Sequence, residues 1–432
     1  MRLRKTITTI VATAILLAGW QLFAVIANQP ELIPSLPRLV RTLCEWLVSS
    51  SFYQSVGATI LRGILGMSIS FVCAIGMAGL FARFEWVYEL FRPLLAIMRS
   101  IPVISFILLA LIFLNPESIP LMIAFLTMFP LLTENLTRGI LDLRPGLSIM
   151  ARQFHIRRSN VLFQIIYPQL KPFLYSGLAS AAGFGWRAII MGEVLSQCAF
   201  GIGSEMKRAQ NFIAVPELLA WTIVAVFISF FFDKGISKVA DITPKISFAN
   251  EDQTIPTPTL SVLDTKDISY QYGIQHFSHS FQKGIIYGIS APSGKGKTTL
   301  LNLIGGILLP TEGEIHPTRH FGIATIFQQP QLLPYLTAEE NIILPLSSFL
   351  TEEKARRIAQ KHLQEMEMEP FGNRYPKELS YGQQQRIAIA RALAYPSPLL
   401  LMDEPFKGLD EALSHRIIER IREKQMKEER II

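Results

Sequence analysis

Residues 284–301 read GIIYGISAPSGKGKTTLL, and this stretch decides the fold of the C-terminal half of the chain. It begins with an apolar run typical of a β-strand, continues into a glycine-rich loop and ends in a helical pattern. Strand, loop with Gly-Lys-Thr and helix, in that order, are the context in which such a loop holds phosphate. The loop's backbone N–H groups and the helix N-terminus point at the same anion, so the stretch predicts a site for the β- and γ-phosphates of a nucleotide.

Side chains of this loop add charge and a metal-ligating oxygen. We expect Lys297 to place a positive charge on the phosphates and the Thr298 hydroxyl to ligate Mg²⁺. The first glycine of the usual pattern is Ala291 here, which costs on the order of 1 kcal/mol if that position needs a positive φ. The predicted nucleotide-binding residues of the loop are Ser293, Gly294, Lys295, Gly296, Lys297, Thr298 and Thr299.

A second apolar run, residues 397–405, ends in two carboxylates followed by a proline. We predict that the Asp403 carboxylate binds Mg²⁺ through the coordination shell of the ion. Glu404 is the predicted catalytic residue, because it is placed to orient or activate water for attack on the γ-phosphate. An apolar run ending in Asp-Glu is weak evidence alone, but it is strong evidence when it is paired with the phosphate loop.

Residues 379–383 read LSYGQ and open an alanine-rich helix, which predicts a second anion-binding helix N-terminus. This segment resembles the signature motif of the ATP-binding cassette (ABC) family, with Tyr381 in place of the first glycine of that motif. The resemblance implies that Ser380, Gly382 and Gln383 close on the nucleotide held by the opposite subunit, so that two sites are shared across a dimer. It covers nearly all of residues 261–432.

Other positions resemble the same family. Gln328 looks like the loop glutamine that contacts Mg²⁺ and the membrane domain. Tyr272 is placed like the aromatic that stacks on adenine, although an ordinary strand aromatic is an equally good interpretation. Residues 408–410 resemble the loop at the dimer seam. The switch histidine of the family, which normally follows the next strand after Glu404, is not found before Ile432; hydrolysis is then crippled, completed by another polypeptide, or lost to a shortened reading frame.

The composition places the N-terminal half in lipid. Half of the 432 residues are hydrophobic and the mean hydropathy is +0.33, too apolar for an ordinary soluble protein of this size. Before residue 240 there are 20 Lys and Arg against 11 Asp and Glu, net +9; after it there are 21 against 23, net −2. The basic excess therefore belongs to the apolar half, which favours loops on anionic lipid and argues against a nucleic-acid surface.

About six membrane spans are predicted in this half. Residues 7–27 form an apolar stretch long enough to cross a hydrocarbon core, and a retained span is a better interpretation than a cleaved signal peptide. Residues 62–83 form a second clear span. An even number is required if both the N-terminus and the ATP-binding part are cytoplasmic, which favours all four weaker candidates. These are about residues 100–116, 118–137, 172–198 and 214–236.

The basic loop at residues 138–171 should face the cytoplasm. It can be aligned with the motif E-A-A-x3-G-x9-I-x-L-P of binding-protein-dependent import permeases: Ala151, Ile165 and Pro168 match, and His155 stands at the glycine. The resemblance implies a coupling helix at about residues 139–171 and a permease of the nitrate, sulfonate and taurine importer group. We interpret His155 as a loop histidine without a role in preference to a pH sensor.

Two charged side chains lie inside the predicted fifth span. Arg187 and Glu193 are six residues apart and therefore poorly placed to pair on one helix face. We expect Glu193 to lie near the outer end of its helix and to be solvated. The alternative is a position on the translocation path, since burial of a lone charge in lipid costs several kcal/mol.

Together these observations predict a multi-domain chain, with an all-α transmembrane permease bundle followed by an α/β P-loop nucleotide-binding domain. The boundaries are 1–240 for the permease, 241–260 for a polar, proline-containing linker and 261–432 for the cassette, which lacks its C-terminal end. We expect both the N-terminus and the cassette on the cytoplasmic side of the cytoplasmic membrane.

The expected function is ATP-driven import of a small solute, with ATP and Mg²⁺ as cofactors. The partners implied by the resemblance are a second copy or a related half-transporter, and an extracytoplasmic solute-binding protein; no nucleic acid is expected. The alternative is a nonhydrolysing or degenerate ATP-binding membrane subunit. An exporter with fused domains fits less well, because it should lack the coupling motif.

Overall fold

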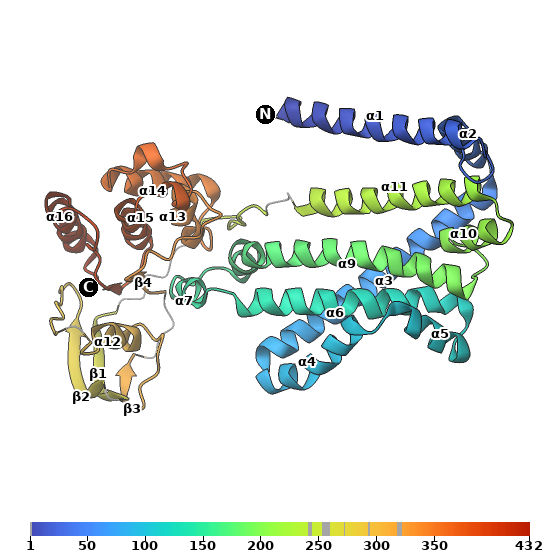
Figure 1. The fold of residues 1–432 in the computed structure, drawn as a ribbon. Coiled ribbons are helices and arrows are strands. Elements are labelled where there is room, and N and C mark those ends of the chain that lie inside the picture. Colours follow the sequence, from blue (N-terminus) through green and yellow to red (C-terminus); the bar gives the residue numbers. More distant parts are fainter. Residues whose placement is uncertain (1, 241–243, 253–259, 272, 293, 318–321) are drawn as a thin grey trace. The chain divides into compact units, whose positions relative to one another are not determined.

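The computed structural model describes residues 2–240, 244–252, 260–271, 273–292, 294–317 and 322–432 (Figure 1). The chain divides into two compact units. Unit 1 comprises Met1–Asp142 and Leu170–Ile242, and unit 2 comprises Leu143–Gln169 and Thr243–Ile432. The loop that separates two helices of the apolar half is thus folded into the same unit as the C-terminal half.

Unit 1 is helical throughout its named elements, as the apolar sequence predicts. In lipid every backbone polar group needs an internal partner, and a helix provides one within a single segment. The helices are α1 (Arg2–Ala27), α2 (Leu36–Trp46), α3 (Ser50–Arg83), α4 (Glu85–Ser100), α5 (Val103–Phe113), α6 (Ile119–Leu141), α9 (Tyr167–Ser196), α10 (Ile202–Asn211) and α11 (Val215–Ala240), with a short 3-10 turn η1 (Pro116–Ser118) before α6.

Four stretches of helix in the described chain are long and apolar enough to cross a membrane: Ser50–Arg83, Pro116–Leu141, Arg158–Ser196 and Val215–Lys238. A shorter apolar helix covers Val11–Ala27. The expected straight span at residues 100–116 is replaced by α4 and α5, which meet at an angle of 95°. Pro102 explains the break, since proline lacks an N–H and forces Ile101 before it into an extended conformation, observed at φ −71° and ψ 130°.

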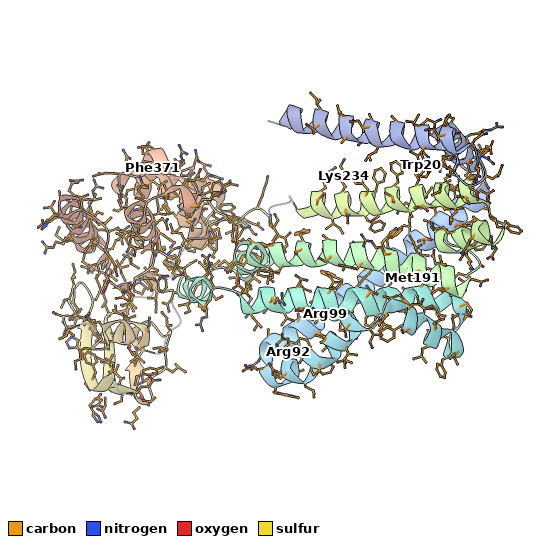
Figure 2. All side chains as sticks on the ribbon, viewed as in Figure 1. Trp20, Arg92, Arg99, Met191, Lys234 and Phe371 are labelled. Atoms are coloured by element: carbon orange, nitrogen blue, oxygen red, sulfur yellow. The ribbon has the colours of Figure 1, made fainter. Side chains whose placement is uncertain are left out.

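The surface of unit 1 is rich in exposed apolar side chains. Trp20 on α1 and Met191 on α9 are 37% and 40% exposed, and both are labelled in Figure 2. Contiguous apolar surface of this extent is unfavourable in water and fits a lipid surrounding. Inside the unit, α3 approaches α6 closely: a Cβ on Gly66 would lie 2.7 Å from the Cβ of Ala124. Small residues permit such close helix packing in membranes.

Glu193 is not solvated, so the expectation for this residue was wrong. Its side chain has no exposed surface, and its Oε1 lies 2.7 Å from Nη1 of Arg62 on α3. Thr59 donates a hydrogen bond to the same carboxylate at 2.9 Å, and the Gly203 N–H donates another at 2.9 Å. Arg62 also pairs with Glu117 at 2.7 Å. Partners from two other helices, α3 and α10, satisfy the buried charge, which explains how it is tolerated there.

Unit 2 combines helices with two small sheets. Its elements are α7 (Pro145–Gln153), α8 (Arg158–Asn160), a π-helical turn η2 (Val161–Ile166), β1 (Val262–Tyr270), β2 (Ile274–Gln282), α12 (Lys297–Ile304), β3 (Glu312–His316), β4 (Ala324–Ile326), α13 (Ala338–Leu346), α14 (Glu352–Glu365), η3 (Glu369–Phe371), η4 (Pro376–Glu378), α15 (Tyr381–Ala394), β5 (Leu400–Met402) and α16 (Glu411–Glu428). One sheet is antiparallel in the order β2-β1-β3, and the other pairs β4 with β5 in parallel.

The main core of unit 2 includes side chains from the loop that joins α6 to α9. Leu147, Met150 and Phe154 are almost fully buried in one cluster with Ile326 of β4 and Leu344 of α13. Burial of such side chains is worth about 1.5–3 kcal/mol each relative to exposure, so the loop is an integral part of this core.

The strand predicted before the phosphate loop, residues 285–289, belongs to neither sheet in the described part of the chain. Its backbone bonds run to the last residue: Tyr287 N donates to Ile432 O at 2.8 Å, and Ile432 N donates to Ile285 O at 3.2 Å. Ile431 forms a parallel bridge with Leu399 before β5. Residues 430–432 thus enter the space between this segment and β5, where a cavity of about 510 Å³ remains.

Candidate functional site

The glycine-rich loop has the backbone geometry that its glycines permit. Gly294 and Gly296 have φ values of 79° and 81°, in the left-handed region where other residues are strained. Ala291 is described and has no positive φ, so the cost foreseen for alanine at this position does not arise. Lys297 begins α12, which leaves the loop leading directly into a helix N-terminus.

The three residues predicted to ligate Mg²⁺ are brought together. Thr298 Oγ1 donates to Asp403 Oδ2 at 2.9 Å, and both residues line a cavity of about 270 Å³ together with Gln328. Hydroxyl, carboxylate and amide oxygens are the hard donors that Mg²⁺ prefers, so this set fits the ion. Gly146 and Ile149 of the α6–α9 loop line the same cavity.

Lys297 points its ammonium group at the loop itself. Its Nζ donates to Ala291 O at 2.6 Å and to Pro292 O at 3.2 Å. These two carbonyl oxygens hold the ammonium group beside the N-terminus of α12. A bound phosphate would compete with them for the ammonium group. Among the other predicted loop residues, Gly294 and Lys295 are exposed and Thr299 is half-buried. Ser293 and Tyr272 lie outside the described residues.

Glu404 lies two residues after the end of β5, in a left-handed conformation with φ 48°. Lys407 Nζ lies 3.1 Å from its carboxylate, and Gln328 Nε2 donates to the same oxygen at 3.3 Å. The hydrogen bond from Lys407, followed by that from Gln328, lowers the pKa of Glu404, so its side chain is ionised at neutral pH. Lys407 was not predicted; only its position three residues after Glu404 hinted at this contact.

Two polar side chains of the signature segment, Ser380 and Gln383, are hydrogen-bonded within the first turn of α15. Ser380 caps α15 by accepting from Gln383 N at 3.3 Å, while the Gln383 side chain accepts from Ser380 N at 2.9 Å. Tyr381 donates its hydroxyl to Gln328 O at 2.8 Å, and a Cβ on Gly382 would lie 2.6 Å from Gly408 O. Within the described chain the segment therefore lies beside Gln328 and the 408–410 loop, and none of its recorded hydrogen bonds reaches the phosphate loop.

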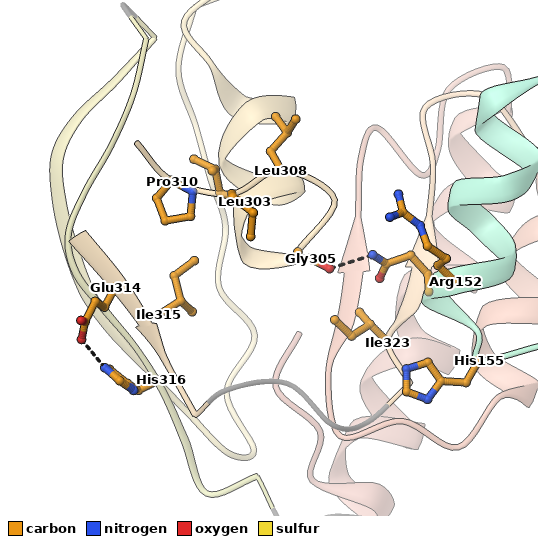
Figure 3. Close-up of a pocket in the computed structure, with 13 residues that line it drawn as sticks. Arg152, His155, Leu303, Gly305, Leu308, Pro310, Glu314, Ile315, His316 and Ile323 are labelled. Atoms are coloured by element: carbon orange, nitrogen blue, oxygen red, sulfur yellow. Dashed lines mark hydrogen bonds and ion pairs between the residues drawn. The ribbon is translucent and has the colours of Figure 1, made fainter. Parts of the chain in front are cut away.

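The α6–α9 loop is hydrogen-bonded to the sheet region of unit 2 through Gln153, a residue that sequence reasoning missed. Gln153 Nε2 donates to Gly305 O at 2.7 Å, a bond drawn in Figure 3, and its backbone oxygen accepts from Ile323 N at 2.7 Å. These bonds lie at the edge of a cavity of about 580 Å³, which His155 and Arg152 also line.

His155 occupies a conformation that favours glycine. Its φ is 46°, in the left-handed region, at the position where the aligned import-permease motif has its glycine. Burial lowers the pKa of His155, so protonation is disfavoured. The backbone conformation gives a physical reason for the glycine in that motif, and the interpretation of His155 as a residue without a role stays a prediction.

Comparison with known proteins divides the chain in the same way as the sequence. A family model described as "Binding-protein-dependent transport system inner membrane component" matches residues 54–233. A model described as "ABC transporter" matches residues 274–407.

Individual relatives match the C-terminal part. An uncharacterised ABC transporter ATP-binding protein of Methanocaldococcus jannaschii is 38% identical over 168 residues, which is 34% of this chain and 72% of the relative. An Fe(3+) ions import ATP-binding protein of Rhizobium etli is 37% identical over 164 residues, 36% of this chain and 46% of the relative. A spermidine/putrescine import ATP-binding protein of Nitrosomonas europaea is 35% identical over 168 residues, with the same two shares.

A solved dimeric structure of an ATP-binding cassette bound to ADP and Pi matches 39% of this chain and 84% of that chain, with 33% identity and a TM-score of 0.36. The chain spans about half the length of the two import relatives.

Proposed function

Because the chain belongs to the ABC transporter family, we propose that it is a permease–ATPase fusion that imports a small solute across the cytoplasmic membrane at the expense of ATP. The observation that carries this proposal is the cavity shared by Thr298, Gln328, Asp403 and the α6–α9 loop. A loop that leads into two long apolar helices lines the same space as the residues expected at the nucleotide. A change at the nucleotide can therefore move the loop directly.

The ABC ATPase domain binds ATP, and each residue of the site has a distinct proposed role. Lys297 exchanges its two carbonyl partners for phosphate oxygens, and the loop N–H groups hold the β-phosphate. Bound Mg²⁺ would neutralise charge that develops on the transferred phosphoryl group, with Thr298, Asp403 and Gln328 around it. Glu404 orients the attacking water after its bonds from Lys407 and Gln328 rearrange.

Two copies are needed in this proposal, because the signature segment of one chain closes on the phosphate loop of the other. We propose a homodimer or a heterodimer with a related half-transporter, and delivery of the solute by an extracytoplasmic binding protein. The cargo class suggested by the permease resemblance is a small anion such as nitrate or a sulfonate, or a pyrimidine vitamin precursor. We propose that the N-terminus and the cassette lie on the cytoplasmic side.

ATP turnover by the purified full-length chain tests the proposal. Glu404→Gln should lower the hydrolysis rate at least about 100-fold while ATP binding persists, because loss of a positioned base costs about that much. Lys297→Ala should weaken ATP binding itself. Glu353→Gln is the matched control, since its side chain is 85% exposed on α14 and pairs with Arg357 one turn away.

The second candidate function is a membrane subunit that binds ATP without hydrolysing it. The observation that favours it is the position of Glu404, whose carboxylate is occupied by Lys407 and Gln328. Absence of turnover at saturating Mg-ATP, with binding intact, would establish this function and exclude the first.

A further inference from the structure

Residues 244–252, which we call the clasp, are hydrogen-bonded to the α6–α9 loop instead of forming a free linker. Asn160 and Ser247 make a reciprocal pair: Ser247 N donates to Asn160 Oδ1 at 2.9 Å, and Asn160 Nδ2 donates to Ser247 O at 2.8 Å. Gln164 Nε2 donates to Pro244 O at 3.0 Å. A backbone that receives this many bonds is held in one register.

The clasp is also hydrogen-bonded to the ends of helices α13 and α14. These helices belong to residues 260–432, which we call the ATPase part. Ala249 N donates to Ser347 O at 3.1 Å, at the end of α13. Asp252 accepts from the Thr351 N–H at 2.9 Å and from the Thr351 hydroxyl at 3.1 Å, where α14 begins. The first of these bonds is the main reason that the pKa of Asp252 is lowered. The clasp thus bridges two segments that are far apart in sequence.

Apolar contacts accompany these bonds. Ile246 and Phe248 of the clasp pack against the same core cluster that contains Phe154 of the loop and Leu344 of α13. Their side chains alternate with the exposed residues Lys245 and Ser247, a pattern typical of a strand with one covered face.

The Asn160 side chain links the α6–α9 loop both to the clasp and to the end of α13. It lies on the α6–α9 loop, is 1% exposed, and donates from Nδ2 both to Ser247 O of the clasp and to Ser347 Oγ at 2.8 Å. Ser347 is fully buried as well. Replacement of Asn160 by an apolar side chain would leave buried partners unsatisfied, which is more costly than the loss of an exposed hydrogen bond.

We propose that the clasp, through Asn160, is the positioning element that holds the α6–α9 loop on the ATPase part of the same chain. The loop, the clasp and the ATPase helices belong to one compact unit of the same chain, so each ATPase part serves the loop of its own chain. The inference rests on the proposed function only where it concerns the motion that the docked loop passes from the nucleotide site to the apolar helices. The docking of the loop itself does not depend on ATP hydrolysis.

A cleavage experiment on the full-length chain tests the clasp. A protease site is inserted between Asp252 and Leu260, the protein is cut in detergent, and the dissociation constant of the two fragments is measured by size-exclusion chromatography at several dilutions. The wild-type fragments should stay associated. Asn160→Leu should raise the dissociation constant about tenfold or more, equivalent to about 1.4 kcal/mol or more of lost association free energy. Asn373→Leu, at an exposed asparagine, is the control.

Ser247→Pro is the second variant, because it removes the N–H that donates to Asn160 while the Ser247 side chain is exposed. Before cutting, both full-length variants should keep the wild-type affinity for a fluorescent ATP analogue, which a general loss of folding would abolish. Wild-type-like association of the Ser247→Pro fragments would overturn the proposal, as would separation of the wild-type fragments on cutting. Failure of ATP hydrolysis would affect neither outcome.

Discussion

His155 has a strained backbone, with φ 46° in the left-handed region, and the prediction that its imidazole has no role can be tested. His155→Gly should relieve its left-handed backbone and change the free energy of unfolding of the chain by no more than about 1 kcal/mol, in the stabilising direction. Arg152→Gly is the matched control, since the same replacement inside α7 should destabilise by about 1 kcal/mol. Urea midpoints of the two variants measure the difference; a strongly destabilised His155→Gly would show that the imidazole has a structural role at the cavity.

The buried His362 on α14 should make the folding stability of the ATPase part decrease at acid pH. Burial, followed by the nearby charge of Lys424, lowers the pKa of His362 to about 3, whereas 6.5 is its ordinary value. The unfolded state therefore binds the proton first, and stability is lost as pH falls below 6.5 towards 3, by up to about 1.4 kcal/mol per pH unit. Unfolding free energies at pH 7, 6 and 5 should show this slope in the wild type.

His362→Gln should flatten that slope, and His415→Gln, at an exposed position of α16, should leave it unchanged. An equally steep slope in His362→Gln would assign the acid sensitivity to another group.

Residues whose roles depend on a short motif could be predicted from the sequence, and residues whose partners are distant could not. Thr298 and Asp403 were expected to meet because the loop and the carboxylate pair are both motif positions, and they are hydrogen-bonded. Asn160 and Gln153 have partners 87 to 187 and 152 residues away, so no local pattern indicated them. The proposed roles of the nucleotide-site residues stay predictions.

At the scale of elements, α3 and α9 are joined by the buried pair of Arg62 and Glu193. Glu193→Gln or Arg62→Met alone should destabilise unit 1 by about 3–5 kcal/mol, since each leaves an uncompensated buried charge or its unsatisfied partners. The double variant should lose less than the sum of the two. Denaturation midpoints in detergent measure this coupling, and additive losses would contradict it.

Glu89→Gln is the control for that cycle. Glu89 and Arg92 form a pair at 3.8 Å on α4 with side chains 61% and 66% exposed, and exposed pairs contribute about 0–1 kcal/mol.

Hydropathy located four long apolar helices of the described chain, because a span needs about 20 consecutive apolar residues regardless of its neighbours. About six spans were predicted, and the described chain has four, or five if the bent pair α4–α5 is one span. Hydropathy did not show that α4 and α5 meet at 95°. It also suggested a solvated Glu193, because the compensating Arg62 lies 131 residues earlier in the chain and composition carries no information about that contact.

At the scale of the whole molecule, composite sites predict complementation between two inactive copies. If each phosphate loop works with the signature of the other copy, chains carrying Lys297→Ala and chains carrying Ser380→Ala should regain activity when co-expressed. Random pairing makes half of the dimers mixed, and each mixed dimer has one intact site, so about a quarter of wild-type turnover is expected. Activity no higher than that of the separate variants would show that each site lies within one chain.

The domain order along the chain could be predicted, but the way in which the loop joins the ATPase part could not. A change in composition near residue 240 marks the end of the apolar half. The folding of Leu143–Gln169 into unit 2, and of residues 244–252 against it, depends on contacts between segments that each look like ordinary connections in sequence.

The burial of Leu147, Met150 and Phe154 has a consequence for biosynthesis. These side chains leave the ribosome roughly 240 residues before Tyr395, which packs against the ring of Phe154. At bacterial elongation rates of about 5–20 residues per second, these apolar side chains stay exposed on the order of tens of seconds before Tyr395 is synthesised. Nascent chains of this protein should therefore depend on a chaperone during that interval, and slow codons after residue 170 should increase their aggregation.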